Sequence, residues 1–176
     1  MEIVGIGNAL MDVIAFVDEE FAPSLGFHNN TTTHLDRPRL DSVLSLIPEP
    51  LMIAGGGAAN TARVAALLGI KSTFLGSIGE DSLGERYRLD LKGDGVEVMA
   101  RLSPRKTGVF LSLTRPDGGR TVLVAPGAAL DISLEPPPAE LFKKGALLYL
   151  EGFLLRDRGF FLSCLESARR ADMIMK

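Results

Sequence analysis

The stretch from Gly55 to Asn60 contains the residues best suited to hold a small polar ligand. Gly55, Gly56 and Gly57 enter an apparent helix, and their lack of side chains lets a ligand approach the backbone. The start of a helix leaves N–H groups free as donors, and Asn60 adds an amide. This combination suits a ligand with many hydroxyls, each needing a donor and an acceptor. The same residues are equally compatible with a turn before an alanine-rich helix packed on a sheet.

Asn8 and Asp12 are two polar residues in the otherwise apolar opening of the chain. A carboxylate near the end of a buried strand is costly unless it is hydrogen-bonded. Two adjacent sugar hydroxyls would supply such hydrogen bonds to Asp12. Asparagine also favours turns, and taken alone the pair fits a turn better than a binding site.

The two commonest phosphate-binding signatures are absent. The dinucleotide fingerprint needs a third glycine, but Leu10 stands there after Gly5 and Gly7, and Asn60 stands there after the later glycines. The P-loop needs a Gly-Lys pair, and the sequence has none. An NAD(P)-dependent oxidoreductase is therefore a less favoured alternative.

Strands and helices alternate along the chain, which predicts an α/β fold with a largely parallel sheet. Asp81 and Ser82 can cap the start of one helix, and Ser82 and Glu85 have the spacing of a capping box there. An expected hairpin over 107–125 and the strand at 13–17 interrupt the alternation, and they predict a small β flap. Other expected strands are 3–6, 73–78, 96–98, 146–149 and 171–175, and the main expected helices are 58–68, 81–92 and 157–170.

Composition narrows the class of protein. The 176 residues suit one domain, and the balance of 19 basic against 22 acidic residues disfavours nucleic-acid binding. The single cysteine, Cys164, forms no internal disulfide, is expected in the core and favours a reducing, cytoplasmic setting. No signal peptide, membrane span or metal site is predicted, since the two histidines lack partners at ligand spacing.

Four ordered motifs resemble the PfkB/ribokinase-like sugar and nucleoside kinases. Residues 4–12 (VGIGNALMD) resemble the family's opening, and residues 54–62 (AGGGAANTA) resemble its first signature. Residues 76–84 (GSIGEDSLG) with 91–96 (LKGDGV) match its next stretch, and residues 117–121 (DGGRT) resemble its lid hairpin. The likeness runs through the chain, apart from residues 28–46.

The resemblance implies a ribokinase-like fold of three α/β/α layers, with lid strands around 10–17 and 107–125. It implies transfer of the γ-phosphoryl group of ATP, with Mg²⁺, to a hydroxyl of a sugar or nucleoside. The sequence does not identify which one. The lid of some relatives pairs with a second copy, so a homodimer is a further expectation.

The resemblance also assigns roles by position. Asn8, Asp12 and Asn60 would bind the acceptor substrate, and Gly56 and Gly57 would let it approach the start of the helix. The same resemblance places two more polar residues: Glu151 as a substrate contact and Arg120, in the lid hairpin, as a group that neutralises the transferred phosphate.

The family's later motifs are missing from this sequence. Its D-T-x-G-A-G-D-type segment supplies the general base and an anion hole, and its N-x-x-E motif organises Mg²⁺; neither occurs here. Residues 1–176 therefore read as the N-terminal part of such a kinase, apparently truncated, which binds the acceptor and lacks the catalytic base and the ATP and Mg²⁺ sites. The alternative is a non-catalytic module that binds a sugar or nucleoside.

Overall fold

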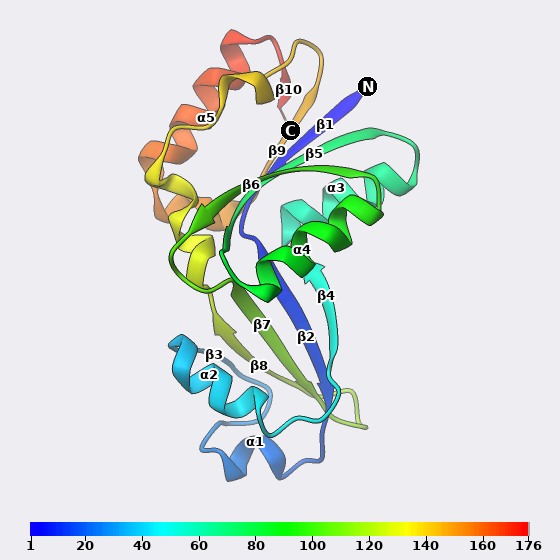
Figure 1. Ribbon diagram of the computed structural model, residues 1–176, viewed down its shortest axis with the longest axis vertical. Helices are drawn as coiled ribbons and strands as arrows, with labels where there is room; N and C mark the ends of the chain where they lie inside the picture. Colours follow the sequence, from blue (N-terminus) through cyan, green and yellow to red (C-terminus); the bar gives the residue numbers. More distant parts are fainter. Residues whose placement is uncertain (176) are drawn as a thin grey trace.

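The structure, a computed structural model, describes residues 1–175 and contains two β-sheets placed end to end (Figure 1). The main sheet has five strands in the order β10-β9-β1-β5-β6, and every neighbouring pair is parallel. The predicted parallel sheet is confirmed. Its strands are β1 (Glu2–Ile6), β5 (Lys71–Gly79), β6 (Val96–Ser103), β9 (Leu147–Leu150) and β10 (Ile174–Met175).

One face of the main sheet is covered by α3 and α4. The small side chains of Ala58 and Ala62 let α3 pack closely on the strands, and both are fully buried. Tyr87 of α4 packs beside Phe74 of β5, with ring centroids 6.1 Å apart. Both helices were predicted, the first from its alanine-rich apolar pattern and the second from its capping residues; they are α3 (Gly57–Leu67) and α4 (Ser82–Gly93).

The opposite face is covered by α5 and a 3₁₀ segment, η1, which completes the predicted three layers. Cys164 of α5 lies in this core beside Leu148, as predicted, and burial raises the pKa of its thiol to about 12. Because both faces are covered, the strands are near-continuous apolar runs. These elements, with two further 3₁₀ segments, are α5 (Arg158–Arg170), η1 (Gly127–Leu134), η2 (Ala139–Leu141) and η3 (Gly152–Arg156).

The second sheet, called the lid sheet here, contains the flap strands and two more. Its order is β3-β8-β7-β2-β4. β7 and β8 form an antiparallel hairpin, while β2 runs parallel to β7 and antiparallel to β4. The flap is therefore larger than predicted, because β3 and β4 extend both its edges. The strands are β2 (Leu10–Phe16), β3 (Thr32–His34), β4 (Leu51–Gly55), β7 (Gly108–Thr114) and β8 (Arg120–Ala125).

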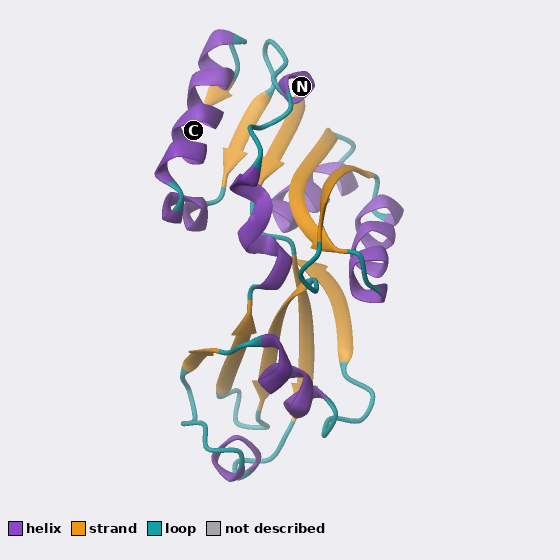
Figure 2. Ribbon diagram, turned by 60° about the vertical axis from the view of Figure 1, so that its left-hand side comes forward, coloured by secondary structure: helices purple, strands orange, loops and turns teal. Residues whose placement is uncertain are grey.

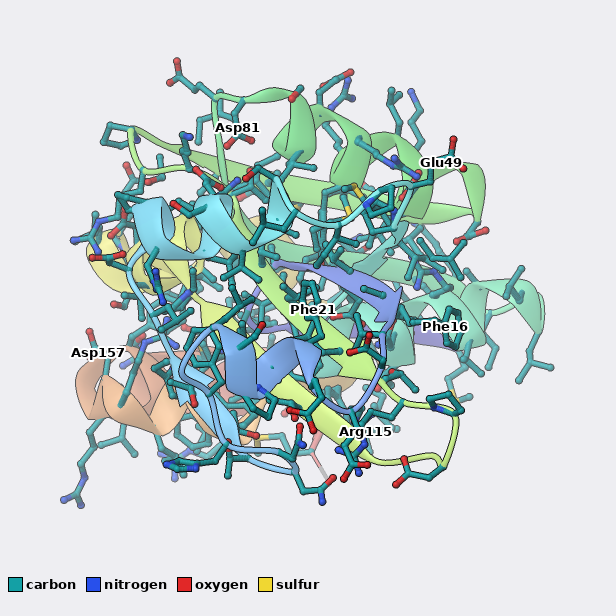
Figure 3. The ribbon with its side chains drawn as sticks, turned by 90° about the horizontal axis from the view of Figure 1, so that it is seen from below. Phe16, Phe21, Glu49, Asp81, Arg115 and Asp157 are labelled. Atoms are coloured by element: carbon teal, nitrogen blue, oxygen red, sulfur yellow. The ribbon has the colours of Figure 1, made fainter. Side chains whose placement is uncertain are left out.

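The lid sheet has one covered face and one open face (Figure 2). On the covered face, Val13 and Leu111 pack with Leu40 and Val43 of α2 in one core. Alternate residues of the same strands, such as Ile14, point to the open face. In Figure 3, Phe21 on α1 and Phe16 at the end of β2 are labelled. The two helices are α1 (Phe21–Ser24) and α2 (Arg37–Leu44).

The predicted capping box of α4 is wrong. Asp81 is the N-cap residue, and its Oδ1 accepts a hydrogen bond from the backbone N–H of Gly84 at 2.8 Å. Glu85 instead forms an ion pair with Arg88 at 2.6 Å. Asp81 also accepts hydrogen bonds from the backbone N–H and the hydroxyl of Thr107, at 2.9 and 2.6 Å. The cap therefore ties α4 to the segment that leads into the lid sheet.

None of the helices among residues 1–175 has both the length and the apolar character needed to cross a membrane.

Candidate functional site

Most of the predicted polar residues gather where the chain passes from the main sheet to the lid sheet, whereas Arg120 pairs with Thr114 at the far end of the lid sheet. β1 ends at Ile6 and β2 begins at Leu10, so Asn8 lies in the connection between the two sheets. Asp12 follows on β2, on the face that α1 and α2 leave open. β4 runs into α3 through Gly56, which brings the start of α3 to the same junction (Figure 1).

A hollow of about 580 Å³ lies on the open face of the lid sheet. Small-molecule sites have volumes of this order, about 300–1,000 Å³. Its lining contains one carboxylate, Asp12, and one cation, Arg120. Arg120 is exposed, and its guanidinium forms no hydrogen bond or ion pair with other side chains or backbone groups of residues 1–175. The lining is Asp12, Ile14, Phe110, Ser112, Thr114, Gly118 and Arg120.

Asp12 is a partly buried carboxylate that receives no hydrogen bond from any other residue in the described part of the chain. Burial raises the pKa of Asp12 to about 6, and the nearby guanidinium of Arg63 partly offsets this shift. Tyr87, close behind, directs its hydroxyl to the carbonyl of Gly55 at 2.8 Å rather than to the carboxylate. Asp12 therefore has free lone pairs near neutral pH, and these can accept hydrogen bonds from hydroxyls.

The glycines before α3 serve the protein's own polar groups. A Cβ on Gly55 would stand 2.2 Å from the Asp12 carboxylate, and a Cβ on Gly56 would stand 2.1 Å from the carbonyl oxygen of Asn8. Gly56 also has φ of 97°, which side chains rarely allow. The lack of side chains at these two glycines thus lets Asp12 and Asn8 pack against the start of α3. From the sequence alone, this packing role could not be distinguished from a role in admitting a ligand.

Glu151, directly after β9, occupies part of the start of α3. Its Oε2 accepts a hydrogen bond from the backbone N–H of Asn8 at 2.6 Å, and the carboxylate also accepts from the N–H of Gly57. Burial raises the pKa of Glu151, and these two N–H groups counteract the rise. The backbone donor of Gly57, expected to be free for a ligand, is therefore engaged by Glu151.

Two arginines that sequence reasoning missed belong to this cluster. Arg63, one turn after Asn60 in α3, donates from Nη1 to Oδ1 of Asn60 at 3.0 Å. Arg156, at the end of η3, donates from Nη1 to Oδ1 of Asn8 at 2.8 Å. The i, i+3 spacing of Asn60 and Arg63 was a usable signal. No local pattern connects Asn8 with Arg156, which is 148 residues away.

The structure thus places the predicted residues in two neighbouring groups. Asp12 and Arg120 line the hollow of the lid sheet, whereas Asn8, Gly57, Asn60 and Glu151 surround the start of α3 and do not line it. Arg63 connects the groups, because it contacts Asn60 and lies close enough to Asp12 to lower that residue's pKa. Asn60 itself is exposed and also borders a shallow groove on the outside of α3.

Side chains that could bind a metal ion are not clustered in the described part of the chain. Among residues 1–175 no three His, Cys, Asp or Glu side chains lie together as metal ligands. A hard cation such as Mg²⁺ is bound by clustered oxygens and substrate phosphates. The residues present therefore do not fit an ATP–Mg²⁺ site, and no chemical step through that pair follows from them.

Residues 2–174 match a protein-family model described as the pfkB family of carbohydrate kinases. The aminoimidazole riboside kinase of Salmonella typhimurium is 34% identical over 138 residues, which cover 74% of this chain and 43% of that protein. Adenosine kinase 2 of Arabidopsis thaliana is 29% identical, with coverages of 87% and 47%. The chain spans about half the length of the curated relatives it matches.

Solved structures share the fold. A probable sugar kinase from Rhizobium etli superposes with a TM-score of 0.86 at 24% identity, covering 99% of this chain and 54% of that one. The adenosine kinase from Sinorhizobium meliloti gives 0.81 at 24% identity, with coverages of 99% and 55%. The three-layer arrangement with its lid sheet is therefore ribokinase-like, as the sequence motifs predicted.

Proposed function

The chain belongs to the pfkB family of carbohydrate kinases, and from that premise we propose that it carries the acceptor-binding part of a sugar or nucleoside kinase. The complete enzyme would transfer the γ-phosphoryl group of ATP to a hydroxyl of the acceptor. The observation that carries the proposal is Asp12, a partly buried carboxylate without a protein donor in the described chain, which faces a hollow of about 580 Å³.

In this proposal each predicted residue has a chemical task. Asp12 accepts hydrogen bonds from two neighbouring hydroxyls of the acceptor, and these bonds offset the burial of its charge. Asn8 and Asn60 supply amide groups, and Glu151 holds Asn8 in place through its backbone N–H. Arg120, with no partner among residues 1–175, approaches the phosphoryl group as charge develops on it.

Gly56 and Gly57 carry no side chains, so the acceptor can approach the backbone at the start of α3. The general base, the anion hole and the groups that organise ATP and Mg²⁺ come, in this proposal, from the remainder of a full-length kinase. Positioning and charge neutralisation dominate phosphoryl transfer, so these groups set the rate. We therefore expect residues 1–176 to bind the acceptor without rapid ATP turnover.

Calorimetry tests the proposal directly. We expect adenosine, ribose or fructose to bind the chain, and Asp12→Ala to weaken that binding about tenfold or more, because a hydrogen bond to a charged group contributes roughly 1.5–3 kcal/mol. Glu166→Gln, on the exposed side of α5, is the matched control and should leave binding unchanged. Absence of binding by all three ligands would remove the acceptor site.

The same measurements separate the alternatives. Binding with no ATP turnover also fits a non-catalytic module that senses a sugar or nucleoside, and adding the missing half of a related kinase distinguishes the two, because only the kinase fragment regains turnover. Binding of NAD(P) in place of a sugar or nucleoside would support the oxidoreductase alternative.

A second copy of the chain is the proposed macromolecular partner. Phe16, Leu51 and Ile53 on the open face of the lid sheet are 76%, 61% and 46% exposed. Apolar side chains gathered on one sheet face are typical of a surface that binds something. Sedimentation at rising concentration should show a dimer that Ile53→Lys dissociates, while Leu162→Lys on α5, 44% exposed, should not affect it.

A further inference from the structure

The orientation of the Asn60 carboxamide is fixed by its neighbour Arg63. A guanidinium has only donors, so the atom that accepts from Arg63 Nη1 at 3.0 Å must be the amide oxygen. The guanidinium is itself anchored, because its Nε donates to Oδ2 of Asp94 at 2.7 Å. Asn60 therefore keeps its NH₂ group as the free end of the carboxamide.

The Asn8 carboxamide is fixed in the same way from another part of the chain. Arg156 Nη1 donates to Oδ1 of Asn8 at 2.8 Å, and Nη2 donates to the carbonyl of Ala129 at 2.6 Å. Asn8 is 7% exposed, and its backbone N–H is held by Glu151. Within residues 1–175, Nδ2 of neither Asn8 nor Asn60 donates to another residue, so each carboxamide again has a free NH₂.

Arg63 carries a further sign that this cluster is built around a ligand. Its Nη2 is buried and has no hydrogen-bond partner in the part of the chain that the structure describes. A buried donor without an acceptor costs roughly 1–3 kcal/mol. An acceptor oxygen brought beside Arg63, from a bound ligand or from a water molecule, would satisfy this nitrogen.

We propose that Arg63 and Arg156 are positioning residues that fix Asn60 and Asn8 with their NH₂ groups, rather than their oxygens, directed to the acceptor substrate. This inference rests on the proposed function. The site then offers fixed donors from the two asparagines and acceptors from Asp12. Each acceptor hydroxyl must receive a hydrogen bond from an amide and donate its own proton to the carboxylate. This polarity selects hydroxyls and disfavours groups that only donate.

Fluorinated adenosines test the polarity, because a C–F group is a weak acceptor that donates nothing. At pH 8, where Asp12 is ionised, we expect wild type to bind 2′- or 3′-fluoro-deoxyadenosine about threefold more tightly than the matching deoxyadenosine, the lower end of a neutral hydrogen bond. In Arg63→Met or Arg156→Met the freed carboxamide can turn its oxygen to the ligand, so this preference should disappear or reverse.

Two further variants separate positioning from folding and from charge. Asp94→Asn weakens the anchor of Arg63 without touching the ligand groups, and it should reduce the fluorine preference partially. Arg63→Lys keeps a cation near Asp12, whose neighbours also include Tyr87 of α4 and, in the lining of the same hollow, Arg120. A lysine lacks the planar guanidinium that contacts Asp94 through Nε and Asn60 through Nη1. This variant should therefore lose the preference for the fluoro ligand, while its ligand affinity should depend on pH as it does in wild type.

A readout without ligand completes the test. NMR couplings through the hydrogen bonds should connect Arg63 Nη1 with Asn60 Cγ, and Arg156 Nη1 with Asn8 Cγ. Missing couplings, or equal weakening of fluoro and deoxy ligands in both methionine variants, would overturn the inference, since lost packing alone leaves their ratio unchanged. Intact couplings without any binding of adenosine or its analogues would instead overturn the proposed acceptor site, and with it the ligand-facing part of this inference.

Discussion

The two faces of the lid sheet are built from the same strands, but only one of them is covered. On the covered face, Val13 and Leu111 are fully buried against the core that α2 completes. On the open face, Ile53 lies opposite Asp12 in the β2–β4 register and remains half exposed. The covered face is apolar, whereas the open face mixes apolar residues such as Ile14 and Phe110 with polar ones such as Asp12, Ser112 and Arg120, so polarity already distinguishes the two faces.

The difference indicates that the covered face stabilises the fold and that the open face is available for binding. The covered face contributes apolar burial, at about 25 cal/mol per Å². The open face carries one carboxylate, Asp12, whose burial raises its pKa and costs stability. We therefore expect substitutions on the covered face to change stability and substitutions on the open face to change binding.

The largest expected effect is on the covered face. Leu111→Ala on the central strand β7 removes a fully buried side chain, and we expect a loss of about 2–5 kcal/mol in the free energy of unfolding. Ile53→Ala on the open face should cost less than about 1 kcal/mol. Urea unfolding of both variants measures the contrast, and equal losses would contradict the division between the faces.

The next effect concerns the packing of Gly55 against Asp12. Gly55→Ala would place a Cβ 2.2 Å from the carboxylate, which must then move. We expect ligand affinity to fall about tenfold or more, as for loss of a hydrogen bond to a charged group. Gly93→Ala at the end of α4 meets no atom within 4 Å and is the matched control for calorimetry. Unchanged affinity in Gly55→Ala would show that Asp12 does not contact the ligand.

A smaller effect, of opposite sign, is expected for Asp12→Asn. The pKa of Asp12 is about 6 in the folded protein, against 3.8 for an unperturbed aspartate, so the folded state holds the proton more tightly. Stability of the wild type should therefore fall as the pH rises from about 4 to 6. Asparagine does not titrate, and above pH 6 the variant should be more stable by roughly 1–2 kcal/mol, allowing for solvent access.

Thermal unfolding of wild type and Asp12→Asn at pH 4, 6 and 8 checks this. The two proteins should converge in stability at pH 4 and separate at pH 8, and at pH 8 the variant should bind adenosine more weakly than wild type. A variant that is less stable than wild type at pH 8 would show that Asp12 is stabilised by the protein rather than reserved for a ligand.

Much of the main sheet could be predicted because its signals are local. The alanines of α3 and the apolar runs of β5 and β9 determine their elements without reference to distant residues. β4 was missed because Leu51–Gly55 is short and ends in glycine, so it reads as the entry to α3. Its pairing with β2, which makes it a strand, depends on residues about 40 positions earlier in the chain.

The site was predictable only in part, for a related reason. Asn8 and Asp12 were noticed as polar residues in an apolar stretch, and Asn60 as an amide in the first turn of a helix after three glycines; both signals are local. The partners that orient them are distant in sequence. Arg156, 148 residues after Asn8, donates a hydrogen bond to its side chain, and Glu151, after β9, accepts one from its backbone N–H. The glycines were expected to admit a ligand, but their contacts with Asn8 and Asp12 depend on the pairing of β2 with β4, which is not a local signal.

The smallest expected effect is at the free end of the open face. Phe16 is 76% exposed, so Phe16→Ser should change the free energy of unfolding by less than about 0.5 kcal/mol. Phe27→Ser, the matched control, removes a buried ring that packs beneath the guanidinium of Arg39, and it should cost about 3 kcal/mol or more. Unfolding at two protein concentrations makes the test sharper. If Phe16→Ser destabilises only the concentrated sample, a second copy of the chain covers the open face. In that case the lid sheet has one covered and one open face only in the monomer.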